Sequence, residues 1–106
     1  MTEDKRQTGD RVLERPETGE KTAEPPLFKV LLLNDDYTTM QFVVEVLETV
    51  FDKHPAEAFR IMMQVHVQGL GICGVYPFEI AETKVQTVHQ MAREHGFPLR
   101  AGLEEE

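Results

Sequence analysis

Two carboxylates and an amide stand side by side in this chain of 106 residues, at Asn34-Asp35-Asp36. They follow the apolar run Leu27–Leu33 and precede a second apolar stretch, so we expect them between a strand and a helix. Farther along, Met62, Val65 and His66 have the i, i+3, i+4 spacing that places side chains on one helical face. Together these parts describe an apolar pocket rimmed by hydrogen-bond acceptors, which suits a cation bearing several donors.

The same residues allow other interpretations. Asn34-Asp35-Asp36 could be a polar turn with Thr38 capping the next helix, and His66 could be a hydrogen-bonded core residue. An enzyme could use Asp35 or Asp36 with His66 as an acid–base pair. A purely structural interaction module is a third hypothesis.

Other chemistry finds little support. The chain has no serine, and its one cysteine, Cys73, lies in an apolar run that predicts a buried structural thiol. The four histidines lack zinc-ligand spacing, and we expect no metal and no cofactor. Gly69-Leu70-Gly71-Ile72-Cys73-Gly74 matches G-x-G-x-x-G, but it should follow a helix and enter a strand. It therefore predicts a helix stop and tight strand packing instead of a phosphate site.

The net charge of −8 argues against partners such as nucleic acids and anionic membranes. No apolar run approaches the roughly 20 residues of a membrane span. We therefore expect a cytoplasmic protein.

Residues 1–26 are rich in charge and poor in aliphatic side chains, so they predict a disordered N-terminal extension. Residues 27–106 predict one folded domain, an α+β sandwich in the order β-α-α-β-α-β. We expect its boundaries as follows: a strand at 27–33, a helix from Thr38, a helix from Pro55 to Gly69, a strand at 71–76, a helix from Pro77 to Gly96, and a strand at 98–103. The second helix is apolar nearly all round, which predicts that most of it is buried. In the third helix, Ile80 is among the residues expected to face inward.

Several segments of the chain resemble the ClpS family of Clp protease adaptors. They include Val30-Leu31-Leu32-Leu33-Asn34-Asp35-Asp36-Tyr37-Thr38-Thr39-Met40, Met62-Met63-Gln64-Val65-His66 and Ala81-Glu82-Thr83-Lys84-Val85. The resemblance covers Leu27 to Leu103 in unbroken order. It implies three antiparallel strands and three helices, as in the C-terminal domain of the ribosomal stalk protein L7/L12. It also implies a non-enzymatic adaptor, or N-recognin, that takes N-end-rule substrates to a Clp AAA+ ATPase-protease.

The resemblance assigns a role to each site residue. The free α-amino group of an N-degron would be bound by Asn34, Asp35, Asp36 and His66. A bulky N-terminal side chain (Leu, Phe, Tyr or Trp) would enter a pocket of Leu32, Thr38, Met40, Val43, Met62, Val65 and Leu99. Met40 would act as a gate against β-branched Val and Ile.

The partners implied are N-degron-bearing proteins and the N-terminal domain of a ClpA- or ClpC-like ATPase. Tyr76, Glu79, Thr83 and Lys84 match positions used for docking to that ATPase, and a monomer is expected. The N-terminal extension corresponds to a segment that acts during handover. The chain departs from many relatives at Thr39, where they carry proline, and it lacks a cysteine common in the last strand.

Overall fold

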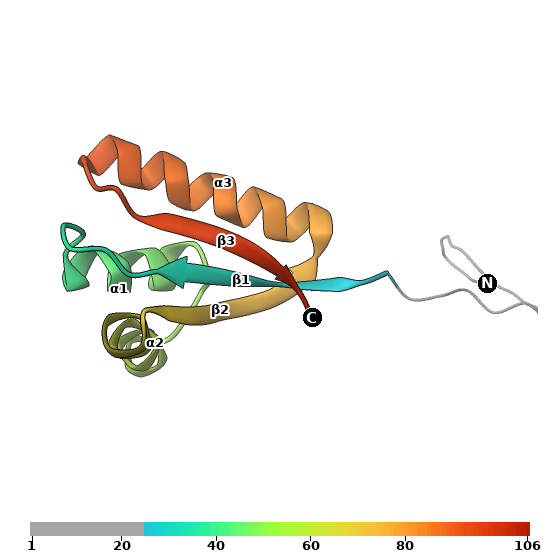
Figure 1. Cartoon of the computed structure of the whole chain (residues 1–106), viewed down its shortest axis with the longest axis horizontal. Coiled ribbons are helices and arrows are strands. Elements are labelled where there is room, and N and C mark those ends of the chain that lie inside the picture. Colours follow the sequence, from blue (N-terminus) through green and yellow to red (C-terminus); the bar gives the residue numbers. More distant parts are fainter. Residues whose placement is uncertain (1–24) are drawn as a thin grey trace, which may run out of the picture.

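Strand β1 (Leu27–Leu33) lies at the centre of a three-stranded antiparallel sheet with the order β2-β1-β3 (Figure 1). The structure is a computed structural model, and it describes residues 25–106. The predicted disorder of residues 1–26 therefore concerns a segment that, except for Pro25 and Pro26, lies outside the described residues. The expectation that 27–106 is the adaptor domain stays a prediction.

The remaining elements follow the expected order. They are α1 (Met40–Thr49), α2 (Pro55–Gln68), β2 (Leu70–Pro77), α3 (Phe78–His95) and β3 (Arg100–Glu105). The α+β prediction of three helices and three antiparallel strands is confirmed. The last strand begins and ends two residues later than expected, because Glu104 and Glu105 still pair with Lys29 and Phe28 of β1.

Proline and glycine set three helix boundaries as the sequence indicated. Pro55 occupies the first turn of α2, where its missing N–H costs no hydrogen bond. Gly69 and Gly96 end α2 and α3 with φ of 93° and 77°, the left-handed region that a side chain disfavours. The predicted start of the first helix at Thr38 is wrong by one residue. Thr39 is the N-cap, because its hydroxyl accepts from the N–H of Phe42 at 3.1 Å, whereas the Thr38 hydroxyl is used elsewhere.

The core lies between the sheet and the helices. Val30 and Leu32 of β1, Leu47 of α1, Ile61 of α2 and Val88 of α3 are each at most 1% exposed. Burying such side chains contributes roughly 1.5–3 kcal/mol each to folding. These side chains belong to one buried cluster that joins the sheet to all three helices.

Two burial predictions are wrong. Helix α2 is not mostly buried, since Phe59 and Val67 are 56% and 70% exposed. One face of α2 packs on α1 and β2, and no other helix or strand within residues 25–106 makes extensive contact with its other face. Ile80 is 50% exposed, because the neighbouring Ala81 takes the inward position on α3 and successive helical residues diverge by about 100°.

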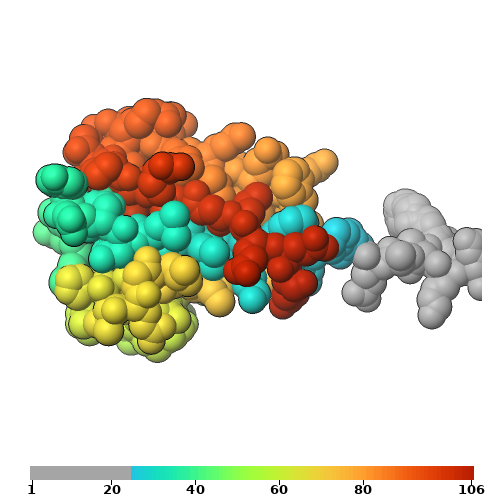
Figure 2. All heavy atoms as spheres, viewed as in Figure 1, coloured from blue at the N-terminus to red at the C-terminus, as the bar shows by residue number. Residues whose placement is uncertain are grey.

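No helix of the described residues 25–106 covers the opposite face of the sheet. Figure 2 shows the cyan atoms of β1 reaching the surface between the red atoms of the C-terminal strand and the yellow atoms of the α2 region. Leu33, Leu70 and Ile72 lie on this face and are 37–43% exposed. None of the helices within residues 25–106 is long and apolar enough to cross a membrane.

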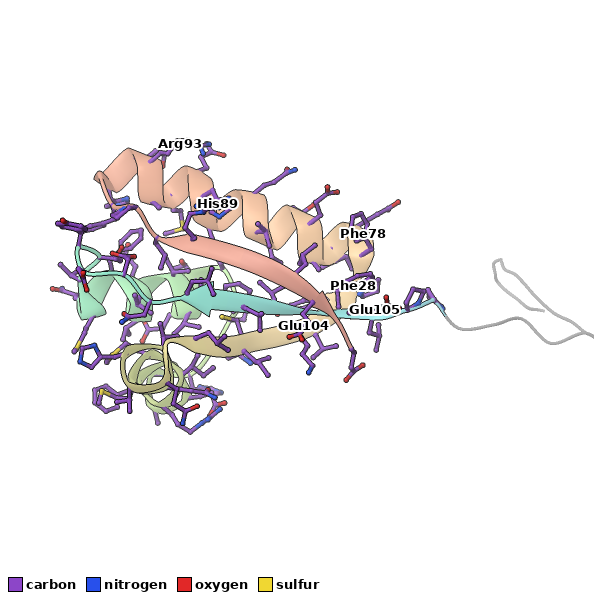
Figure 3. The ribbon with its side chains drawn as sticks, in the orientation of Figure 1. Phe28, Phe78, His89, Arg93, Glu104 and Glu105 are labelled. Atoms are coloured by element: carbon purple, nitrogen blue, oxygen red, sulfur yellow. The ribbon has the colours of Figure 1, made fainter. Side chains whose placement is uncertain are left out.

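Side chains of α3 also contact the edge strand β3 and the start of β1 (Figure 3). The rings of Phe28 and Phe78 meet edge to face with centroids 5.3 Å apart. Nε2 of His89 accepts a hydrogen bond from the N–H of Ala101 at 3.0 Å. Burial lowers the pKa of His89, and the charge of Arg100 lowers it further, so this ring stays neutral and can accept.

Candidate binding site

One carboxylate holds the loop between β1 and α1 in shape. Oδ1 of Asp35 accepts from the backbone N–H groups of Tyr37 and Thr38 at 2.8 and 2.7 Å, and Oδ2 accepts from the Thr38 hydroxyl at 2.7 Å. Burial raises the pKa of this carboxyl, but the hydrogen bonds from Thr38 and Tyr37 outweigh burial and leave the pKa below its usual value. Asp35 is therefore ionised at neutral pH, and it organises the loop.

Both ends of this loop are anchored. The N–H of Asn34 donates to the carbonyl of Gly69 at 2.9 Å, which ties the end of β1 to the end of α2. At the other end, the N-cap of Thr39 fixes the first turn of α1. The loop is thus tied to both helices that complete the site.

A hollow of about 230 Å³ opens between the loop, α1 and α2. Its lining residues are Asn34, Asp35, Asp36, Thr38, Met40, Val43, Met62, Val65 and His66. Val43, Met62 and Val65 are buried and form an apolar interior, whereas Met40 is 44% exposed. The sequence-predicted residues from three separate segments therefore meet at one place.

Two predicted pocket residues do not line this hollow. Leu32 is 0% exposed in the core, and Leu99 is 2% exposed. Leu99 lines a different hollow of about 250 Å³, together with His89 and Arg100. Contact of Leu32 or Leu99 with a bound side chain stays a prediction.

The rim of the hollow offers acceptors to a cation. Asp36, His66 and Asn34 are exposed. Within residues 25–106 the Asp36 carboxylate accepts no hydrogen bond and forms no ion pair, whereas that of Asp35 is occupied by the loop. A carboxylate beside an apolar interior can hold a group that carries a positive charge at one end and an apolar body next to it.

The same geometry weakens the chemical alternatives. Cys73 is 1% exposed, and burial raises the pKa of its thiol to about 12, so it is a structural thiol and not a nucleophile. The described part of the chain contains no group of three or more His, Cys, Asp or Glu side chains that could hold a metal ion. For an acid–base pair, Asp35 is a poor candidate because its oxygens already accept three hydrogen bonds.

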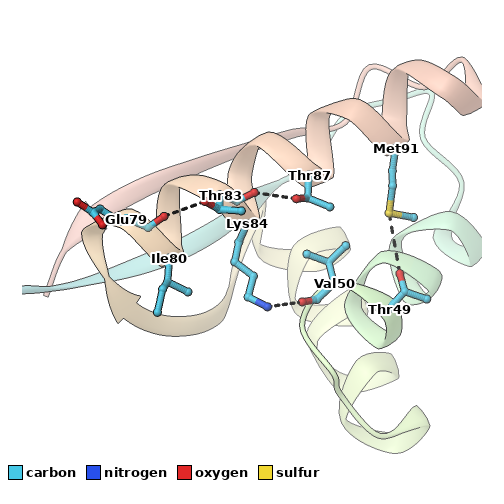
Figure 4. Close-up of a pocket in the computed structure, with 8 residues that line it drawn as sticks. All are labelled: Thr49, Val50, Glu79, Ile80, Thr83, Lys84, Thr87 and Met91. Atoms are coloured by element: carbon cyan, nitrogen blue, oxygen red, sulfur yellow. Dashed lines mark hydrogen bonds between the residues drawn. The ribbon is translucent and has the colours of Figure 1, made fainter.

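The other predicted surface lies around α3 (Figure 4). Glu79, Thr83 and Lys84 line a hollow of about 580 Å³ between α3 and the end of α1. Sequence reasoning missed its other lining residues, which are Thr49, Val50, Ile80, Thr87 and Met91. Among them, Ile80 is the large apolar side chain that is exposed. In the sequence, only the neighbouring Ala81 at an inward helical position could have indicated that Ile80 faces outward.

Lys84 and Tyr76 are part of the structure of this surface. Nζ of Lys84 donates to the carbonyl of Val50 at 2.7 Å, so the side chain bridges α3 and α1. The same Nζ lies 5.4 Å from the centroid of the Tyr76 ring and 5.9 Å from that of Phe51. Tyr76 is therefore beneath Lys84 and does not line the hollow.

An acceptor-rimmed apolar hollow on a small α+β domain is the arrangement of a binding module, and comparisons with known proteins specify which one. The family model described as ATP-dependent Clp protease adaptor protein ClpS matches residues 23–102. A ClpS from Desulfatibacillum aliphaticivorans is 58% identical over 90 residues, covering 85% of this chain and 86% of the relative. One from Desulfotalea psychrophila is 49% identical over the full length of both chains.

A solved structure agrees with this match. The structure of Agrobacterium tumefaciens ClpS2 bound to L-phenylalaninamide is 42% identical, has a TM-score of 0.76, and covers 78% of this chain and 100% of its own. The chain belongs to the ClpS family of Clp protease adaptors, which are not enzymes.

Proposed function

We propose that this chain is an N-recognin. It binds proteins by a free α-amino group and a bulky hydrophobic first residue, Leu, Phe, Tyr or Trp, and delivers them to a Clp AAA+ ATPase-protease. The hollow of the loop, α1 and α2 carries this proposal, since it joins a carboxylate rim to an apolar interior. The phenylalaninamide bound to the Agrobacterium relative supports it, because that ligand has a free amino group and an aromatic side chain.

Physical magnitudes are compatible with this role. Burying a Leu or Phe side chain contributes roughly 1.5–3 kcal/mol. Each well-made hydrogen bond from the ammonium adds roughly 1.5–3 kcal/mol. Association costs roughly 4 kcal/mol or more. Affinity near micromolar, roughly −8 kcal/mol, thus requires all three ammonium donors to be well placed. A peptide without the ammonium should bind far more weakly.

In this proposal one group of residues binds the ammonium of the ligand and another contacts its first side chain. Asn34, Asp36 and His66 accept from the ammonium, and Asp35 acts mainly by holding the loop. Met40, Val43, Met62 and Val65 contact the first side chain, with Thr38 beside them. The neutral imidazole of His66 is required, since a protonated ring would donate and would repel the ammonium.

Fluorescence anisotropy with peptides that differ only at the first residue tests the proposal. Peptides beginning with Leu or Phe should bind, and matched peptides beginning with Gly should not. Acetylating the Phe peptide should remove binding, because it deletes the charge and donors. Affinity should also fall above about pH 8 as the α-amino group deprotonates. An acetylated peptide that binds normally would refute recognition of an α-amino group.

Delivery requires a second surface. We propose that Glu79, Thr83 and Lys84, with Tyr76 beneath, dock to the N-terminal domain of a ClpA- or ClpC-like ATPase, with the adaptor acting as a cytoplasmic monomer. The hollow that three of these residues line is separate from the 230 Å³ hollow and shares no residue with it. Glu79→Lys should therefore reduce stimulated degradation while peptide affinity stays unchanged. Loss of peptide affinity in Glu79→Lys would contradict the separation of the two surfaces.

A further inference from the structure

A glycine of β2 is in direct contact with the helix that forms one side of the binding hollow. Gly71 is buried and pairs with Leu32 of the central strand. A Cβ added at Gly71 would lie 2.8 Å from Cγ2 of Val65 and 3.3 Å from the carbonyl oxygen of Ile61. Carbon atoms in contact are normally about 3.5–4.0 Å apart. Helix α2 therefore approaches the sheet as closely as it does because position 71 has no side chain.

Movement of α2 would change the hollow directly. Met62, Val65 and His66 all line the hollow and all belong to α2, whereas Val43 lies on α1. The side chain of Val65 touches both places, since its Cγ2 is the atom nearest to position 71. Val65 is β-branched and 2% exposed, so it cannot rotate away at low cost.

We propose that Gly71 is a positioning residue that sets the width of the first-residue pocket and thereby its preference among hydrophobic N-termini. This inference rests on the proposed function. A Cβ at position 71 must displace Val65 or α2 by several tenths of an ångström or more. The displacement widens the gap between α2 and α1 and moves His66 relative to Asn34. Leu, the smallest of the bulky side chains, loses contact first, and the larger Phe and Trp side chains still fill the space.

The test compares Gly71→Ala with Gly102→Ala. Gly102 also lies in a strand of the sheet, but an added Cβ there meets no atom within 4 Å, so it is a matched control. In Gly71→Ala the affinity for a Leu-initiated peptide should fall about tenfold and that for a Phe-initiated peptide only about threefold. Gly102→Ala should bind both peptides as the parent does. An unchanged ratio of Leu to Phe affinity in Gly71→Ala would overturn the inference.

A second-site variant separates positioning from a general loss of fold. Val65→Ala removes the methyl group that lies 2.8 Å from the added Cβ. The Ile61 carbonyl oxygen stays 3.3 Å from that Cβ, so adding Gly71→Ala to Val65→Ala should still weaken binding, but clearly less than Gly71→Ala weakens it in the parent. This pair also serves if Gly71→Ala alone does not fold. Additive effects of the two substitutions would overturn the inference.

Peptide binding by the unmodified chain distinguishes failure of the proposed function from failure of the Gly71 inference. If it binds no peptide selectively by its first residue, the proposed function fails, and this inference fails with it. If it binds selectively and Gly71→Ala keeps the same selectivity, only the role of Gly71 is wrong.

Discussion

Replacing Lys84 by alanine should destabilise the domain as well as affect docking. The Lys84 ammonium donates to the carbonyl of Val50 at 2.7 Å, and it lies above the rings of Tyr76 and Phe51. Val50 is the C-cap of α1, so its carbonyl belongs to a helix end that lacks intrahelical partners. A substitution at Lys84 thus removes a bridge between α3 and the end of α1.

The size of this effect follows from the contacts. A hydrogen bond from a charged donor contributes roughly 1.5–3 kcal/mol, and each cation–π contact at a partly exposed site roughly 0.5–1 kcal/mol. Ordering the Lys84 side chain costs up to about 2 kcal/mol of rotamer entropy. The net loss expected for Lys84→Ala is about 2 kcal/mol. For a domain of this size, that lowers Tm by roughly 8–16 °C.

Urea and thermal unfolding of the full chain measure this loss. Glu79→Ala is the matched control, because Glu79 is exposed on the same surface and its side chain makes no hydrogen bond within residues 25–106. Lys84→Met keeps the apolar stem and should lose the hydrogen bond and the cation–π contacts only. If Lys84→Ala and Glu79→Ala have the same unfolding free energy, Lys84 does not bridge the helices. A docking defect in Lys84→Ala should be interpreted only after this comparison.

Three other substitutions have distinct expected results. Met40→Ala should raise the affinity for Val- and Ile-initiated peptides about tenfold in fluorescence anisotropy and keep Leu and Phe, and unchanged selectivity would show that Met40 is no gate. Asp52 has a φ of 55°, so Asp52→Gly should raise the free energy of unfolding in urea by about 0.5–1 kcal/mol, whereas Asp52→Ala should not. The pKa of Asp35 is lowered on folding, so its contribution to stability is complete above about pH 4 and is lost as pH falls further. Asp35→Asn should therefore reduce the fall in urea midpoint between about pH 5 and pH 2, and an equal fall in both proteins would contradict the role of this carboxylate.

The sequence was sufficient where local chemistry decides the structure. The glycines at 69 and 96 and the proline at 55 set helix boundaries through backbone restrictions that hold in any fold. The spacing of Met62, Val65 and His66 placed them on one face, and the structure brings them to the same hollow as Asn34 and Asp36.

Other features depend on contacts between distant segments. Thr38 and Thr39 both carry a hydroxyl that could cap the first helix, so the sequence does not distinguish them. The hydrogen bond from the Thr38 hydroxyl to Asp35 leaves Thr39 as the N-cap. Hydrophobic periodicity in the sequence does not predict how the helices pack on the sheet. This packing determines the outward position of Ile80 and the close approach of α2 to Gly71. The folding back of Lys84 onto Val50, 34 residues away, is likewise a tertiary contact.

The placement of β1 has a mechanical consequence. Its first residue, Leu27, is where the preceding chain enters the domain, and its last residue leads into Asn34 at the other end, about 20 Å away. Strand β1 is hydrogen-bonded to antiparallel neighbours on both sides. A force that pulls on the chain ahead of Leu27 acts along β1, so it loads both ladders together in shear instead of opening them one bond at a time. The domain should therefore resist traction from its N-terminal side, and the loop that rims the binding hollow follows the far end of β1, so it feels the load last.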